Sequence, residues 1–217
     1  LLRLRREAAI ARDVVHPRIV RVFDIEEAGE TVFLTMEIIE GGSLGDRLTT
    51  HSPARPVAID DAARWATQAL EGLAALHAMG ILHRDISPDN MMITRDRRGR
   101  YQMKLIDLGL AKNLEAQAGL EITQAGIFMG KLMYCSPEQA GAIKDAPLDH
   151  RSALYSFAAV LYEMITGQPP FVGTSAAEVE RLAVSGNLVP AFARLEACAA
   201  DDELKRLARR CLAAGLL

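Results

Sequence analysis

Strand-forming and helix-forming patterns occupy different parts of this chain, and this separation limits the fold more than any other feature. Residues 3–12 predict a short helix, which must end before Pro17 because proline disfavours helical geometry in the residue ahead of it. Two runs rich in β-formers, 18–25 and 31–39, follow and predict an antiparallel hairpin. The start of the chain is thus rich in strand patterns, and a long, mainly helical part follows it.

The rest of the chain is expected to be mainly helical. Gly41-Gly42 breaks the strand pattern, and Asp60 is a plausible N-cap for a long helix that Gly80 ends with a left-handed cap. Short apolar runs at 91–94 and 101–106 predict a second hairpin. Helical periodicity then returns in three segments, 152–166, 174–185 and 201–213.

Composition excludes several classes of protein. Half of the 217 residues are apolar, which is enough to bury a core, and a net charge of −3 gives no basic stripe for nucleic acid. The longest apolar stretch, 153–165, is too short to cross a bilayer, so no membrane segment is expected. Three cysteines without metal-ligand spacing fit a reducing compartment, and we predict a cytoplasmic protein.

Three polar residues around the second hairpin point to phosphoryl transfer. This reaction needs a carboxylate to orient the attacking hydroxyl and oxygen ligands that hold magnesium on the nucleotide. Asp85 and Asn90 lie five positions apart in one loop, and Asp107 follows the second strand of the hairpin. Each residue alone is more simply explained as a turn former or a local hydrogen-bonding group, but the set predicts one cleft.

The order of the motifs resembles the eukaryotic-like Ser/Thr protein kinases of bacterial type. His83-Arg84-Asp85, Asn90, Asp107-Leu108-Gly109 and Ser136-Pro137-Glu138 match that family's catalytic loop, magnesium loop and activation-segment end. The resemblance implies a bilobal, kinase-like α+β fold, with a partial small lobe at 1–39 and a helical lobe at 40–217. Within the second lobe it implies a catalytic loop at 83–90 and an activation segment at 107–138, with the last helix missing.

The resemblance also implies roles for single residues. Asp85 would be the catalytic base, and Asn90 and Asp107 would hold Mg²⁺ on ATP while a protein substrate supplies the hydroxyl. The backbone of Glu37 and Ile39 would meet adenine.

Further roles carried by the resemblance are less specific. Met92 would pack under the adenine ring, or is simply a core residue. Glu7 would pair with a lysine outside the chain, or lies on a solvated helix face. Arg84 suggests control by a phosphate on the activation segment, with Thr123 as the acceptor. The resemblance also allows a kinase dimer.

Two departures from the family pattern concern the catalytic loop. Ser87 stands where the family has a cation near the transferred phosphate, and Lys131 stands where it usually has threonine. We hypothesise that the Lys131 ammonium occupies the space left at Ser87 and acts in catalysis beside Asp85; a solvated lysine is the equal alternative. Ala153 replaces an aspartate that ordinarily accepts backbone N–H groups of the catalytic loop.

The ends of the chain suggest a kinase domain cut at both sides. No glycine-rich loop or strand lysine precedes Glu7, so we expect this chain alone to bind ATP poorly and to turn over slowly. The main alternative is a pseudokinase or interaction module, which Ser87 and Ala153 favour and Asp85, Asn90 and Asp107 oppose. A small-molecule kinase of the aminoglycoside-phosphotransferase type ranks lower, because such enzymes lack the 130–138 segment.

Overall fold

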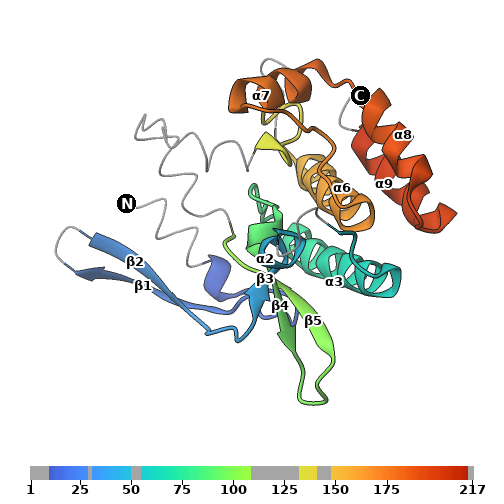
Figure 1. Cartoon of the computed structure of the whole chain (residues 1–217). Coiled ribbons are helices and arrows are strands. Elements are labelled where there is room, and N and C mark those ends of the chain that lie inside the picture. Colours follow the sequence, from blue (N-terminus) through green and yellow to red (C-terminus); the bar gives the residue numbers. More distant parts are fainter. Residues whose placement is uncertain (1–9, 29–30, 50–54, 109–131, 141–147, 215–217) are drawn as a thin grey trace.

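The structure is a computed structural model, and it describes residues 10–28, 31–49, 55–108, 132–140 and 148–214. Its first sheet is the predicted hairpin of β1 (Val22–Ala28) and β2 (Thr31–Met36), paired antiparallel (Figure 1). Residues 10–12 are helical, in agreement with the end of the first predicted helix.

The first strand begins later than the sequence pattern predicted. The backbone N–H of Val20 donates to the carbonyl of Leu105 at 2.8 Å, and the N–H of Leu105 donates to the carbonyl of Arg18 at 2.8 Å. Residues 18–20 therefore pair with Leu105 of a distant strand. Because their backbone groups bond to that strand, they do not belong to the hairpin, and β1 starts only at Val22.

A second sheet carries the central hairpin. Its strand order is β3 (Gly42–Ser43), β4 (Met91–Arg95) and β5 (Tyr101–Leu105), all antiparallel. The preceding strand β2 ends at Met36, before the Gly41-Gly42 pair that was predicted to break it, and Gly42 begins the separate strand β3 by pairing with Ile93. Gly41 has φ of 149°, and a Cβ there would lie 2.1 Å from the Ile93 carbonyl oxygen, so this close approach requires glycine.

The helices of the described part are α2 (Leu44–Thr49), α3 (Ile59–Ala78), α6 (His150–Thr166), α7 (Ala176–Ser185), α8 (Val189–Ala197) and α9 (Asp202–Ala214). The sequence analysis missed α2 and α8. It also assigned the wrong N-cap to α3, because the capping position is Ala58 and Asp60 lies in the first turn. Gly80 follows α3 with φ of 71°, as predicted, and the Ile81 N–H donates to the Leu76 carbonyl.

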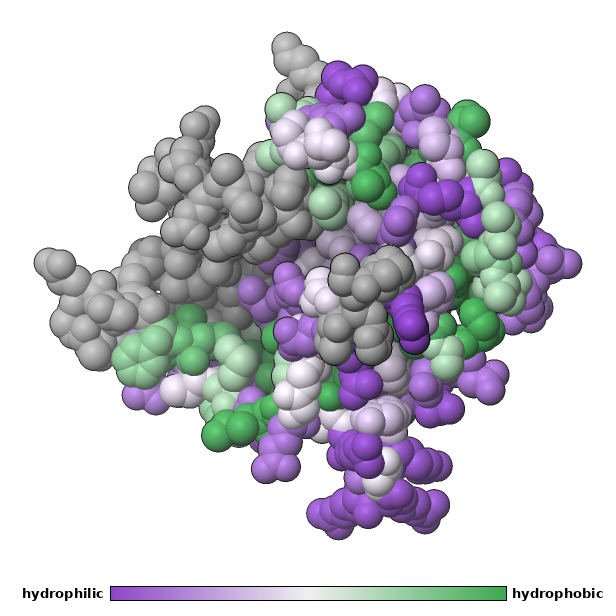
Figure 2. Space-filling model, in the orientation of Figure 1, coloured by the Kyte–Doolittle hydropathy of each residue, from purple (hydrophilic) through white to green (hydrophobic). Residues whose placement is uncertain are grey.

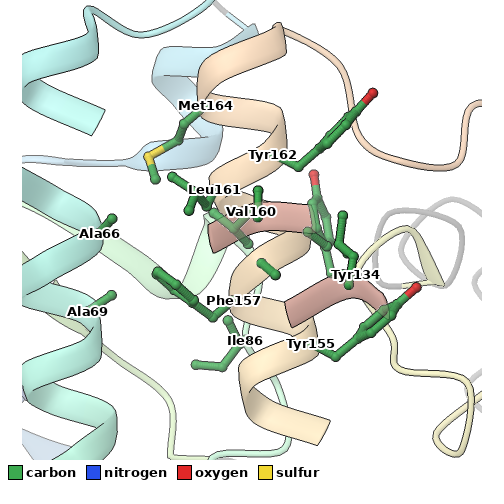
Figure 3. Close-up of a cluster of buried hydrophobic side chains, with 14 of the residues drawn as sticks. Ala66, Ala69, Ile86, Tyr134, Tyr155, Phe157, Val160, Leu161, Tyr162 and Met164 are labelled. Carbon is green, nitrogen blue, oxygen red and sulfur yellow. The ribbon is translucent and has the colours of Figure 1, made fainter. Parts of the chain in front are cut away.

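The main core surrounds α6. Tyr155, Phe157 and Leu161 are almost completely buried. Figure 3 shows Phe157 and Leu161 on the side of α6 that faces the small residues Ala66 and Ala69 of α3, whereas Tyr155 lies on the opposite side. Small side chains on α3 let the two helices approach closely. Ile86 belongs to the same buried cluster (Figure 3). The loop that contains it is thus fixed to the core from inside.

A smaller cluster joins the first hairpin to the helical part. Ala11, Ile19 and Val22 pack there with Leu76 of α3 and with Leu108, the residue after Asp107. In the described part of the chain, no helix combines the length and the apolar character that a membrane span requires.

Candidate active site

His83 lies at the centre of the candidate site. Its side chain is completely buried, and its Nε2 is 3.0 Å from the carbonyl oxygen of Ile106. Burial lowers the pKa of His83 to about 4, although the negative charges of Asp85 and Asp107 act in the opposite direction. The ring is therefore neutral at pH 7 and donates its Nε2–H to the carbonyl. Both carboxylates lie close enough to influence the same imidazole.

Asn90 connects the two loops that carry these carboxylates. Its side-chain Nδ2 donates to the backbone carbonyl of Asp85 at 2.7 Å. Its own carbonyl accepts from the Ile106 N–H at 3.0 Å, and its N–H donates to Ser87 at 3.1 Å across the 3₁₀ turn η1 (Pro88–Asn90). The structure thus brings Asp85, Asn90 and Ile106, the residue before Asp107, together.

Backbone strain is concentrated at these loops. Arg84 has φ of 59° and Asp107 has φ of 56°, and among the described residues no other non-glycine residue has positive φ. Such a conformation costs an L-residue about 1–2 kcal/mol, so the surrounding contacts must enforce it. Asp85 is 6% exposed, whereas Asp107 is exposed and can reach a ligand.

Gln139 is a site residue that the sequence analysis did not identify. Its Nε2 donates to the backbone carbonyl of Arg84 at 3.0 Å. Its Oε1 accepts from the Ser136 N–H at 3.2 Å and lies 3.4 Å from Ser156 Oγ on α6. Gln139, Arg84 and Ser156 line a cavity of only about 10 Å³ together with Asp85. Gln139 therefore connects the loop that carries Asp85 to Ser156 of α6, which lies one turn from Ala153.

The end of the predicted activation segment is fastened to α6 by two hydrogen bonds. Ser152 Oγ donates to Glu138 at 2.5 Å, and the Tyr134 hydroxyl donates to Glu163. Burial raises the pKa of Glu163 despite that hydrogen bond, and the nearby charge of Asp89 acts in the same direction as burial. The segment around Ser136 is consequently held against the core.

The predicted adenine-binding segment lies beside the central sheet. Glu37 Oε1 is 2.6 Å from the Lys104 ammonium and accepts from the Arg21 N–H at 2.9 Å. Partial burial acts to raise the pKa of Glu37, but the contacts with Lys104 and Arg21 lower it overall. Lys104 is paired across the sheet with Met92, which is half-buried.

The structure gives less information on the remaining predicted residues. Ile39 is half-buried, and Ser87 is buried with its carbonyl bonded to Asn90. Glu7, Lys131 and Thr123 lie outside the described residues, so the exchange of roles between Ser87 and Lys131 stays a prediction. No three His, Cys, Asp or Glu side chains of the described segments gather into a metal site. A cation here would need the Asn90 amide, the Asp107 carboxylate and oxygens of a bound nucleotide.

A small sheet, a helical body and two acidic loops joined through a buried histidine define a protein-kinase fold. The protein kinase domain model matches residues 2–214, and the chain belongs to that family. The fold class predicted from the sequence is thereby confirmed.

The chain is similar to several bacterial kinases. It is 41% identical over 171 residues to serine/threonine-protein kinase pkn2 of Myxococcus xanthus, covering 79% of this chain and 20% of that protein. It is 38% identical over 215 residues to serine/threonine-protein kinase PknB of Mycobacterium tuberculosis, covering 96% of this chain and 33% of that protein. The chain thus spans a third or less of the length of these relatives.

A solved structure supports the same fold. The crystal structure of Rad53 residues 1–466 in complex with AMP-PNP superimposes with a TM-score of 0.72 at 26% sequence identity. The match covers 96% of this chain and 49% of the Rad53 chain.

Proposed function

We propose that this chain is part of the catalytic domain of a protein serine/threonine kinase, which transfers the γ-phosphoryl group of ATP to a hydroxyl group of a protein substrate. The observation that carries the proposal is the hydrogen-bonded path from His83 through Ile106 and Asn90 to Asp85. It holds two carboxylate-bearing loops around one buried ring. The names of the bacterial relatives and the nucleotide analogue in the Rad53 complex support the same reading.

In this proposal Asp85 orients the attacking hydroxyl and accepts its proton as the new O–P bond forms. Its backbone carbonyl is held by Asn90, which limits movement of the side chain relative to the substrate. Arg84, in the strained conformation next to it, would pair with a phosphate on the activation segment.

Asn90 and Asp107 fit a magnesium–nucleotide complex. The amide N–H₂ of Asn90 is used by the Asp85 carbonyl, which leaves its amide oxygen as the atom that binds a cation. The Asp107 carboxylate is exposed and supplies a second hard oxygen ligand. Bound Mg²⁺ would neutralise charge on the phosphate oxygens.

The adenine ring would lie against Met92, with the backbone of Glu37 and Ile39 supplying hydrogen bonds. The Glu37–Lys104 ion pair supports this assignment, because it fixes the segment to the sheet that carries Met92. The boundary between the lobes at residues 39 and 40 remains part of this proposal.

Phosphate transfer from labelled ATP to a generic protein substrate tests the proposal in the full-length kinase. Asp85→Asn should lower the rate by about 100-fold or more, because general-base residues typically contribute this much. Asp60→Asn changes an exposed aspartate in the first turn of α3 and should leave the rate within twofold of wild type. Equal rates in both variants would exclude Asp85 as the base.

A pseudokinase is the second candidate, because Ser87 is buried at a position where kinases of this family carry a cation. Thermal shifts with and without magnesium and ATP distinguish the two functions. A pseudokinase that binds nucleotide would be stabilised without any turnover that depends on Asp85. A kinase would show both effects.

A further inference from the structure

Two arginines lie over the ring of Tyr101 at the turn end of the β4–β5 hairpin. The guanidinium carbon of Arg47, on α2, lies 4.5 Å from the ring centroid, and that of Arg95, on β4, also lies 4.5 Å from it. Arg95 additionally donates to the Tyr101 hydroxyl at 2.7 Å. Stacking on an aromatic ring restrains both side chains, so their charged ends are positioned before any ligand arrives.

The two arginines border an open pocket of about 320 Å³. It shares no lining residue with the loops around His83, since its walls come from Glu40 and Gly41, α2, β4 and β5. Ile93 adds an apolar surface to the pocket. The volume suits one or two side chains of an extended peptide.

The charge around the pocket is positive, although the whole chain has a net charge of −3. Among the described residues, neither Arg47 nor Arg95 forms an ion pair with a carboxylate, and Glu40 is the acidic residue of the lining. Residues 95–100 contain four arginines and one aspartate, and that aspartate, Asp96, is already paired with Arg100 at 2.9 Å. Figure 2 shows the hydrophilic side chains gathered over this hairpin, below the body of the molecule.

We propose that this pocket docks an acidic segment of a protein partner, with a side-chain carboxylate or phosphate bound by the guanidinium groups of Arg47 and Arg95. Guanidinium groups match both oxyanions because they offer paired N–H donors in one plane. If the chain phosphorylates proteins, as proposed above, the partner is a substrate that is held at this pocket while its hydroxyl reaches Asp85. The docking itself does not depend on catalysis.

Fluorescence anisotropy with labelled peptides tests the docking site on the full-length protein without ATP. The probes are a hexaglutamate peptide, a hexaglutamine peptide of the same length, and an alanine peptide that carries two phosphoserines. At least one anionic peptide should bind about tenfold or more tightly than hexaglutamine, given the strength of charge-assisted hydrogen bonds. Comparison of the glutamate and phosphoserine probes identifies which oxyanion is preferred.

A matched pair of double variants separates the pocket from general charge attraction. Arg47→Gln with Arg95→Gln should weaken the preferred anionic peptide by about tenfold or more. Arg97→Gln with Arg98→Gln removes the same charge from exposed positions on the same hairpin that do not line the pocket, and should change the affinity by less than about threefold, as expected for exposed charges. Arg95→Lys keeps the charge but not the paired donors, and should give an intermediate loss.

Two results would overturn the proposal: equal weakening by both double variants, or equal affinity for hexaglutamate, phosphoserine and hexaglutamine peptides. Circular dichroism at the assay temperature confirms that each variant is folded, and the Arg95→Lys variant provides a test if the double variant is not. Because no nucleotide is present, loss of phosphotransfer in the separate Asp85 experiment would leave this result unaffected.

Discussion

Replacement of Gln139 should loosen the loop that carries Asp85. The side chain connects three elements, because it donates to the Arg84 carbonyl, accepts from the buried Ser136 N–H and lies beside Ser156 of α6. Gln139→Ala removes the partner of the carbonyl and of the Ser136 amide at once. An unsatisfied buried polar group costs about 1–3 kcal/mol, so we expect about 2 kcal/mol of lost unfolding free energy.

The same substitution should reduce kcat more than it changes KM for ATP. Asp85 follows Arg84 directly, and small displacements of a positioned catalytic group lower rates by about tenfold or more. The predicted adenine contacts at Glu37 and Met92 have no bond to Gln139, so ATP binding should be affected less. Steady-state kinetics and urea denaturation on the full-length kinase measure the two effects separately.

Gln139→Glu tests the contact with Arg84 separately from the contacts with Ser136 and Ser156. It keeps an acceptor for Ser136 and Ser156 but replaces the N–H₂ that bonds the Arg84 carbonyl by a second oxygen. The kcat should fall by a similar factor of about ten, because the lost contact is the one to the catalytic segment. Gln168→Ala, at an exposed glutamine after α6, serves as the control and should match wild type. A wild-type kcat and melting temperature for Gln139→Glu would refute the positioning role.

Three further predictions concern stability. The pKa of His83 is about 4 in the folded protein and 6.5 in the unfolded chain, so its contribution to the free energy of unfolding is complete above pH 6.5 and is lost as the pH falls. The free energy of unfolding from urea titrations should therefore be about 1.4 kcal/mol lower at pH 5.5 than at pH 7.5, and His83→Phe should remove most of this difference. Gly41→Ala should destabilise by about 2 kcal/mol or more, because the methyl group meets the Ile93 carbonyl at a strained φ; an unchanged melting temperature would contradict this geometry. Ala153→Asp should stabilise the protein by about 1 kcal/mol, the net value of one hydrogen bond, because it supplies a buried acceptor for the catalytic loop. The melting temperature should rise accordingly, and a melting temperature below that of the wild type would show that the carboxylate stays unpaired.

Local chemistry explains which elements the sequence predicted. The α3 helix was recognisable because its apolar residues recur on one face and Gly80 supplies the positive φ that ends it. The two-residue strand β3 had no local signal, since Gly42 becomes strand only by pairing with Ile93 about fifty residues later in the chain. The α8 helix was missed because the Gly186–Pro190 stretch has the composition of a turn.

For the candidate site, the sequence by itself determined the residue types, their order and their spacing, and these were enough to propose Asp85, Asn90 and Asp107 as one set. Only the tertiary structure decided how the set is held: His83 is neutral because burial removes its solvation, and Gln139 reaches Arg84 across 55 positions of sequence. The contacts of Arg47 and Arg95 with the Tyr101 ring likewise depend on α2, β4 and β5 meeting in space. Spacing reports which groups a local segment offers, whereas desolvation and long-range hydrogen bonds exist only after distant segments have packed together.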